Sequence, residues 1–278
     1  MRNAMSNRRD DAILISPGLL LLGLGFLVPA ATILVLGVQN PEGGFTLGHL
    51  ARFLGDPHYL AIAWRTIKLS LLITLICALA GFPLAYVMAR ASARLRLWLI
   101  ICITLPLMTS VVVRTFGWMV LLGRGGLVPD ALYALGFVRR NFTLMHTETA
   151  IVVGMAQVLF PFMVLSILGV IMKIDPRIEE ACRVMGCSLL QTVRRVVLPL
   201  SLPGVIAGSL LVFTLSCSYF VTPALLGGAR LPVVAGSIYE TATKTLDWPF
   251  AAAQSIILLV GVMLLLIPYV RLSRRKHG

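Results

Sequence analysis

Six apolar runs, each long enough to cross a lipid bilayer, constrain the fold of this 278-residue chain more than any other feature of its sequence. A membrane-spanning helix needs about 20 predominantly apolar residues, and it satisfies its backbone polar groups internally. Only 13% of the residues are charged, about half the fraction of an average soluble domain. The sequence therefore predicts an all-α integral membrane protein with six transmembrane helices. We expect the spans at about 12–38, 66–89, 97–122, 147–172, 203–227 and 250–271.

The net charge of +13 could indicate a nucleic-acid partner, but the distribution of the charge argues against one. Most of the 24 Lys and Arg residues lie in the N-terminal tail, in 90–96, in 173–195 and in 271–276. These segments all fall on one side of a six-span topology. Because Lys and Arg mark the cytoplasmic side of a membrane protein, we expect both termini to be cytoplasmic. We expect the chain to contact membrane lipid and not nucleic acid.

The sequence shows few residue patterns that could catalyse a reaction or bind a metal. The five cysteines form no Cys-x-x-Cys pair, and the four histidines fall outside the expected spans or at their ends. We therefore predict no catalytic residue and no metal site. An ion-coupled secondary carrier is a weaker alternative, because the spans lack the buried acids that proton relays need.

A charged segment between the fourth and fifth spans has strong helix signals. Asp175 can cap a helix that has Pro176 at its first position, and Gly186 can end that helix. An apolar stripe along the helix is formed by Ile178, Ala181, Cys182 and Met185. The segment thus predicts a short amphipathic helix that a glycine terminates.

A second helix follows, and its start carries the pattern of a capping box, Ser188 with Gln191. We expect Pro199 and Pro203 to break this helix and to turn the chain back into the membrane. By composition alone, two interpretations stay open. The segment is either a connector that lies on the membrane surface or a helix that fits a groove on a soluble partner.

The spacing within this segment resembles the EAA loop of ABC importer permeases, whose pattern is Glu-Ala-Ala, three residues, Gly, nine residues, Ile, any residue, Leu-Pro. The corresponding residues follow without a gap and differ only at Cys182 and Val196. The resemblance extends over about residues 65–271. The residues that carry it are Glu180-Ala181-Cys182, Gly186 and Val196-Val197-Leu198-Pro199.

This resemblance implies a non-catalytic permease subunit of the bacterial inner membrane, whose loop over 175–203 couples it to a separate ATPase. ATP and Mg²⁺ would bind that partner, because this chain has no Gly-x-x-x-x-Gly-Lys phosphate loop. The implied partners are two ATPase copies, a second and homologous permease, and a periplasmic or lipid-anchored substrate-binding protein. The implied domains are 1–64, 65–271 and a basic tail, 272–278. The implied coupling residues are Glu180, Ala181, Met185, Gly186, Leu198 and Pro199.

Further segments resemble the spermidine/putrescine-type permeases, which implies a polyamine substrate. The alternative is the same machinery importing an anion or a chelated metal, such as thiosulfate, phosphonate or iron(III). The segments are Val113–Trp118, Leu198–Leu200 with Pro203 and Gly204, Leu225–Gly228 and Asp247–Phe250.

Polar side chains inside the expected spans are candidates for a translocation path. Arg114 either lines the path or contacts another subunit, or it pairs with a backbone carbonyl, and the sequence favours neither interpretation. The other polar residues could instead make ordinary hydrogen bonds between helices. Gly204 and Gly208 have the spacing of close helix packing. The candidate path residues are Arg114, Gln157, Ser216, Ser218, Tyr219 and Thr222.

Overall fold

A computed structural model describes residues 16–39, 44–139 and 141–274. The N-terminal tail and the start of the first expected span lie outside the described residues, as does 275–278 of the expected basic tail 272–278. The chain divides into two compact units, each described below by itself. The first unit is Met1–Pro57 with Ile238–Ile257, and the second is His58–Ser237 with Leu258–Gly278.

The predicted all-α membrane architecture is confirmed: six helical stretches among the described residues are long and apolar enough to cross a membrane, and there are up to seven if a bent pair is included. The bent pair, Val221–Arg230 and Val234–Thr245, turns by 85°. The six stretches are Ser16–Leu36, Pro57–Arg90, Val111–Ala134, Glu148–Ile171, Leu189–Ser218 and Trp248–Ile267.

The first unit joins the N-terminal helices to the start of the last helix. Asp247 caps that last helix as the sequence predicts, because its Oδ1 accepts a hydrogen bond from the Phe250 amide at 3.2 Å. Its Oδ2 lies 3.0 Å from Nη1 of Arg52, whose guanidinium stacks over the Phe250 ring. The elements are η1 (Gly23–Leu27), α2 (Val28–Leu36), α3 (Gly48–Gly55), η5 (Thr241–Thr245) and the first part of α14 (Trp248–Arg274).

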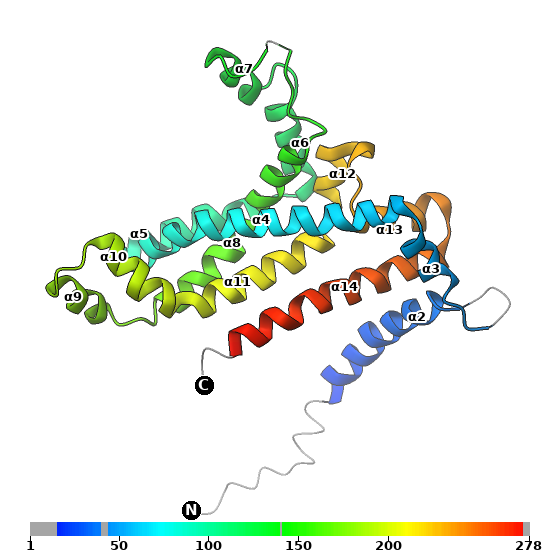
Figure 1. Ribbon diagram of the computed structural model, residues 1–278, viewed down its shortest axis with the longest axis horizontal. Helices are drawn as coiled ribbons and strands as arrows, with labels where there is room; N and C mark the ends of the chain where they lie inside the picture. The colour runs from blue at the N-terminus through cyan, green and yellow to red at the C-terminus, as the bar shows by residue number, and fades with distance from the viewer. Residues whose placement is uncertain (1–15, 40–43, 140, 275–278) are drawn as a thin grey trace, which may run out of the picture. The chain divides into compact units, whose positions relative to one another are not determined.

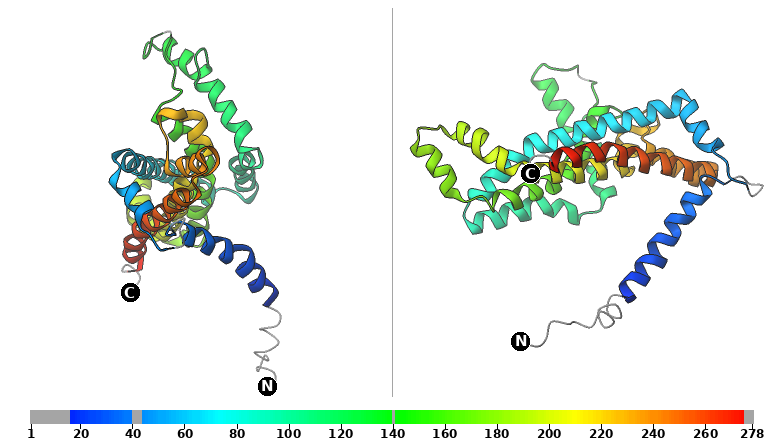
Figure 2. Two further views of the ribbon diagram at one scale, coloured as in Figure 1. Left: turned by 90° about the vertical axis from the view of Figure 1, so that its right-hand side faces the viewer. Right: turned by 60° about the horizontal axis from the view of Figure 1, so that its bottom comes forward.

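The second unit contains the remaining helices, labelled in Figure 1. In it α4, α8 and α11 run side by side, and α9 and α10 lie at the end where α4 gives way to α5 (Figures 1 and 2). Its elements begin with α4 (Pro57–Arg90), α5 (Ala93–Thr104), η2 (Leu105–Met108), α6 (Val111–Leu122), α7 (Leu127–Ala134) and α8 (Glu148–Ile171). They continue with α9 (Pro176–Val184), α10 (Leu189–Thr192), η3 (Val193–Val197), α11 (Leu198–Ser218), α12 (Val221–Gly227), η4 (Gly228–Arg230) and α13 (Val234–Glu240), which crosses into the first unit.

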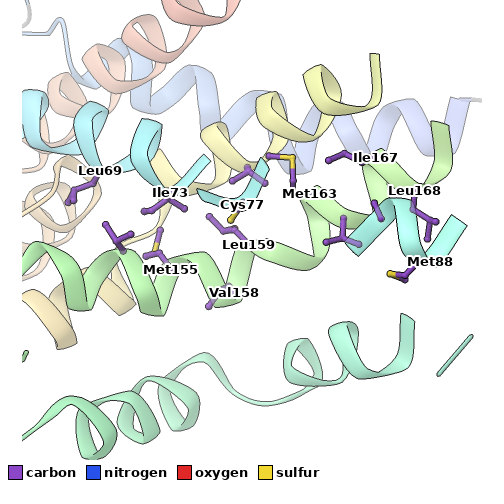
Figure 3. Packing of buried hydrophobic residues seen from close by; sticks show 14 of the residues in the cluster. Leu69, Ile73, Cys77, Met88, Met155, Val158, Leu159, Met163, Ile167 and Leu168 are labelled. Atoms are coloured by element: carbon purple, nitrogen blue, oxygen red, sulfur yellow. The ribbon is translucent and has the colours of Figure 1, made fainter. Parts of the chain in front are cut away.

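Helix α8 forms the centre of the second unit. Its buried side chains, among them Met155, Leu159 and Met163, pack with Ile73 and Cys77 of α4 (Figure 3). All five side chains are almost fully shielded within the chain, so this core is an apolar helix seam.

Two glycines bring α11 close to α8, as their spacing predicts. A Cβ on Gly204 would lie 3.0 Å from the Ser166 carbonyl oxygen, and a Cβ on Gly208 would lie 2.8 Å from the Met163 sulfur. These distances leave no room for a side chain, so the two backbones approach closely only because both residues are glycine.

The third expected span, 97–122, is not continuous. It divides into α5, the short 3₁₀ helix η2 and α6, with extended backbone at Thr109 and Ser110. The Pro106 carbonyl accepts bonds from the Thr109 hydroxyl at 2.7 Å and from Nη1 of Arg114 at 2.5 Å. The Thr109 amide also bonds to this carbonyl at 3.3 Å, which closes the short 3₁₀ helix. The candidate span in this region is Val111–Ala134.

The fifth expected span, 203–227, starts earlier and ends earlier. Helix is continuous over 189–218, and the break falls at Tyr219, whose ψ of 133° is extended. The expectation that Pro199 and Pro203 break the helix is wrong. The π turn η3 ends at Val197, two residues before Pro199, and the Leu198 amide bonds to the Val193 carbonyl in the i to i−5 pattern. The local π turn lets the helix continue into the proline-containing turn.

Candidate functional site

The elbow segment, residues 175–192, forms as the sequence predicts. The Asp175 carboxylate accepts a hydrogen bond from the Arg177 amide at 2.9 Å, and Pro176 is the first residue of α9. Gly186 has φ of +88°, the left-handed conformation that L side chains rarely adopt. The Cys187 amide then bonds back to the Cys182 carbonyl at 3.1 Å, which closes the end of α9.

The second half of the elbow segment begins with the predicted capping box. The Ser188 amide donates to Oε1 of Gln191 at 2.9 Å, and the Gln191 amide donates to Oγ of Ser188 at 3.3 Å. Thr192 and Val197 are buried at the base of this helix, so the elbow segment is anchored where it joins α11.

The predicted coupling residues lie at the surface, four of them in the elbow segment and two, Leu198 and Pro199, at the start of α11. Glu180, Ala181, Gly186 and Pro199 are exposed, and Leu198 is 39% exposed. The elbow also exposes large apolar side chains, which water does not favour on a monomer surface. The exposed fractions are 89% for Val184, 84% for Met185 and 76% for Leu190.

A buried acid next to Glu180 was missed as a site residue by sequence reasoning. Glu179 is 4% exposed and is the one residue of α9 that is buried. Its carboxylate accepts hydrogen bonds from the Tyr86 hydroxyl at 2.9 Å and from Nε and Nη2 of Arg90. The partners are about 90 residues away along the chain, so no local pattern in the sequence indicates this contact.

Arg114 pairs with a backbone carbonyl, which is one of its two interpretations from sequence: its Nη1 donates to the Pro106 carbonyl. The guanidinium therefore caps the broken end of the α5–η2 helix, where a helix dipole favours a cation. Its Nε is buried and has no hydrogen-bond partner among the described residues. Part of the guanidinium thus remains available to another group.

The structure brings Gln157 and Thr222 together with two residues of α6. Oε1 of Gln157 accepts from the indole N–H of Trp118 at 3.2 Å, and the Thr222 hydroxyl lies 3.3 Å from that of Thr115. These contacts join α6 to α8 and α12. They fit the interpretation of ordinary hydrogen bonding between membrane helices.

The three remaining path candidates are less closely associated. The Ser216 hydroxyl is buried without a hydrogen-bond partner among the described residues, whereas Ser218 is exposed and bonds to the Thr214 carbonyl. Tyr219 is half-buried at the break that follows α11. The three residues therefore surround the end of α11 but do not form one hydrogen-bonded cluster.

A small cavity of about 270 Å³ lies between residues of α4, α5, η2 and α8, and Gln157 is the one path candidate in its lining. Its lining includes Cys77, Pro106, Gln157 and Pro161, so it is apolar except for the Gln157 amide. The described residues contain no group of three or more His, Cys, Asp or Glu side chains that could hold a metal ion.

Residues 81–278 match the family described as binding-protein-dependent transport system inner membrane component. The spermidine/putrescine transport system permease protein PotB of Haemophilus influenzae is 35% identical over 221 residues, 80% of this chain and 77% of that protein. PotB of Escherichia coli (strain K12) is 33% identical over 258 residues, 93% of this chain and 91% of that protein.

A solved structure gives the same fold. A chain of a bacterial alginate ABC transporter, in complex with an alginate pentasaccharide-bound periplasmic protein, superposes with a TM-score of 0.82 at 18% identity. The alignment covers 99% of this chain and 98% of that chain. This likeness concerns the fold alone.

The protein belongs to the binding-protein-dependent transport system inner membrane components. It is the permease subunit of an ABC importer, and a separate subunit hydrolyses ATP. Membership also implies an ATPase and a substrate-binding protein as its working partners.

Proposed function

We propose that this permease forms half of the translocation path of an importer for polyamines such as spermidine and putrescine. The observation that carries the proposal is the nearly full-length similarity to PotB of Escherichia coli. In this proposal the path is lined by Gln157, Ser218 and Tyr219, whereas the buried Thr222 hydroxyl pairs with that of Thr115. The neutral oxygen atoms of the lining side chains can accept hydrogen bonds from the ammonium groups of a polyamine.

Reconstituted transport tests the substrate. The permease is assembled with its cognate ATPase, partner permease and binding protein in proteoliposomes, and ATP-dependent uptake of labelled spermidine, putrescine, thiosulfate, a phosphonate and iron(III) is measured. We expect uptake of spermidine or putrescine. Uptake of an anion or of iron(III) without polyamine uptake would assign the alternative substrate class instead.

We further propose that the elbow segment lies in the cytoplasm and docks in a groove of the ATPase. The exposed apolar side chains of Val184, Met185 and Leu190 support this role, because a helix docks in a groove through such anchors. The exposed Glu180 then lies at the contact, and Gly186 sets the angle between the two helices.

Two variants test this docking. Glu180→Arg reverses a charge at the contact, and Gly186→Asp adds a negative charge at the turn between α9 and α10. We expect both variants to reach the membrane and to lose uptake. Glu240→Arg is the control, because Glu240 is an exposed residue of α13 whose carboxylate pairs with Lys244 four residues on. Normal uptake in both elbow variants would refute the docking role.

The proposed assembly contains two ATPase copies, a second permease homologous to this one, and a periplasmic or lipid-anchored binding protein on the opposite face. ATP and Mg²⁺ belong to the ATPase, because this chain lacks the phosphate loop that would hold them. Native mass spectrometry of the purified complex tests the proposed composition. Two identical permease chains in that complex would exclude the heteromeric arrangement.

A further inference from the structure

An ion pair between Arg90 and the buried Glu179 connects α4 to α9, although the two residues are 89 positions apart in the sequence. The Glu179 carboxylate accepts from Nε of Arg90 at 2.9 Å and from Nη2 of the same guanidinium. Its other oxygen accepts from the Tyr86 hydroxyl at 2.9 Å. Both carboxylate oxygens are therefore engaged by side chains from the last turns of α4.

The attachment of α9 depends strongly on this carboxylate. Glu179 is the one buried residue of α9, whereas its neighbour Ile178 and the last residue of the helix, Val184, are exposed. Directly before the helix, Ile174 is buried and its carbonyl accepts from Nη2 of Arg90 at 3.4 Å. Arg90 thus binds both the turn before α9 and the first turn of α9.

The α4 side of this contact is also held firmly. Arg96, from the start of α5, donates to the Met88 carbonyl at 3.0 Å and to the Ala91 carbonyl at 2.9 Å. These bonds satisfy carbonyls at the end of α4 that have no partner within the helix. Met88 itself is fully buried in the core. A force on Arg90 therefore acts on an ordered helix end that is packed into the core.

We propose that Glu179 is a positioning residue that joins α9 to α4, so that a displacement of α9 by the ATPase moves α4 with it. This inference rests on the proposed docking of the elbow segment. It assigns different tasks to two adjacent acids: Glu180 faces the partner, and Glu179 transmits the movement into the membrane helices. A charged pair suits this task because a buried ion loses its partner only at a high energetic cost.

The first test separates coupling from assembly. Glu179→Gln keeps the size of the side chain and removes its charge, and Glu240→Gln is the matched control at the exposed pair of α13. We expect Glu179→Gln to co-purify with the ATPase and to retain ATP hydrolysis, while uptake per ATP hydrolysed falls at least about tenfold. Unchanged uptake per ATP would overturn the proposal.

Milder variants keep the test decisive if Glu179→Gln does not accumulate in the membrane. Glu179→Asp keeps the charge but shortens the side chain, and Tyr86→Phe removes a single hydroxyl. We expect both to fold and to lose part of the coupling, with a smaller loss for Tyr86→Phe because the ion pair remains. Full coupling in Glu179→Asp and Tyr86→Phe alike would contradict the assigned role.

A reversible crosslink tests whether α9 and α4 stay in contact at Glu179 and Arg90 during transport. Arg90→Cys and Glu179→Cys are combined with replacement of the native cysteines, and a short bis-methanethiosulfonate reagent joins the two introduced thiols. We expect uncoupled ATP hydrolysis before crosslinking, recovered uptake after it, and renewed loss on reduction. An inactive crosslinked protein would mean that the two helices must separate, and the proposal would be wrong.

The variants also distinguish failure of the docking proposal from failure of the role assigned to Glu179. If Gly186→Asp is inactive while the Glu179 variants transport normally, the docking proposal stands and the positioning role of Glu179 fails. If all of these variants transport normally, both proposals fail.

Discussion

Gly186 is the residue at which the elbow segment depends most directly on backbone conformation. Its φ of +88° is costly for a residue with a β-branched side chain, although a Cβ would meet no neighbour within 4 Å. We expect Gly186→Val to destabilise the elbow by about 1–2 kcal/mol and to lower uptake, and Gly186→Asn to retain more activity because Asn tolerates this region. Uptake assays on the two variants test this order. Equal activity would show that the left-handed turn is not required.

The two cysteines beside Gly186 give a chemical readout of the same turn. The neighbouring Cys182 side chain, together with desolvation, raises the pKa of the Cys187 thiol. A raised pKa leaves less of the reactive thiolate near neutral pH. We expect Cys182→Ala to lower the pKa of Cys187 and to speed its reaction with maleimide at pH 7.

The pH dependence provides the control for this prediction. The acceleration should shrink as the pH rises past the pKa of Cys187 in the parent protein, because both forms are then thiolates. Labelling rates measured by mass spectrometry between pH 6 and about 10 cover the range of ordinary thiol titration. A constant ratio of rates across this range would indicate a change of exposure and not of pKa.

At the scale of elements, the contact between α8 and α11 depends on the absence of side chains. A Cβ on Gly204 would approach both the Ser166 carbonyl and Val170 to about 3 Å, whereas a Cβ on Gly169 would meet nothing within 4 Å. We expect Gly204→Leu to destabilise the fold by about 1–3 kcal/mol through overpacking. Thermal unfolding in detergent measures the loss. Gly169→Leu in α8 is the control, and an equal loss there would show that helix packing is not the cause.

The local signals of the elements were predictable from sequence, but the breaks were not. Asp175, Ser188 and Asp247 cap helices as expected, since a cap depends on residues within one turn. The break at Thr109 and Ser110 is accompanied by a bond from Arg114 to the Pro106 carbonyl eight residues away, and hydropathy does not reveal that bond. A proline alone was a poor indicator: Pro199 and Pro203 lie in a continuous helix because a π turn precedes them.

In the candidate site, too, the residues of a local motif could be predicted from sequence, whereas contacts between residues far apart in the chain could not. The exposed coupling residues follow one motif within a single loop, so a spacing pattern could find them. The contact of Glu179 with Tyr86 and Arg90 joins residues about 90 positions apart, and only packing of α9 against α4 brings them together. Likewise, the Trp118–Gln157 bond depends on how α6 meets α8. In such cases the residue types are visible in the sequence, but their pairing requires the fold.

For the whole molecule, the distribution of Lys and Arg predicts that the elbow segment faces the cytoplasm. A membrane-impermeant maleimide tests this orientation. In a variant that retains only Cys182 and Cys187, we expect labelling in inside-out membrane vesicles and none in intact spheroplasts. Phe137→Cys in a cysteine-free variant should give the opposite pattern, because Phe137 is 75% exposed and follows α7, on the expected outer side.

Both labelling patterns are needed because a single accessible thiol could reflect leaky membranes. If Cys182 and Cys187 react in spheroplasts while the Phe137→Cys thiol reacts only in inside-out vesicles, the topology is inverted. The ATPase could then not reach Met185, and the docking role of the elbow would fail together with the task assigned to Glu179. If the expected patterns hold, the apolar surface of Val184, Met185 and Leu190 lies on the ATP-containing side of the membrane, where a docked ATPase would shield it from water.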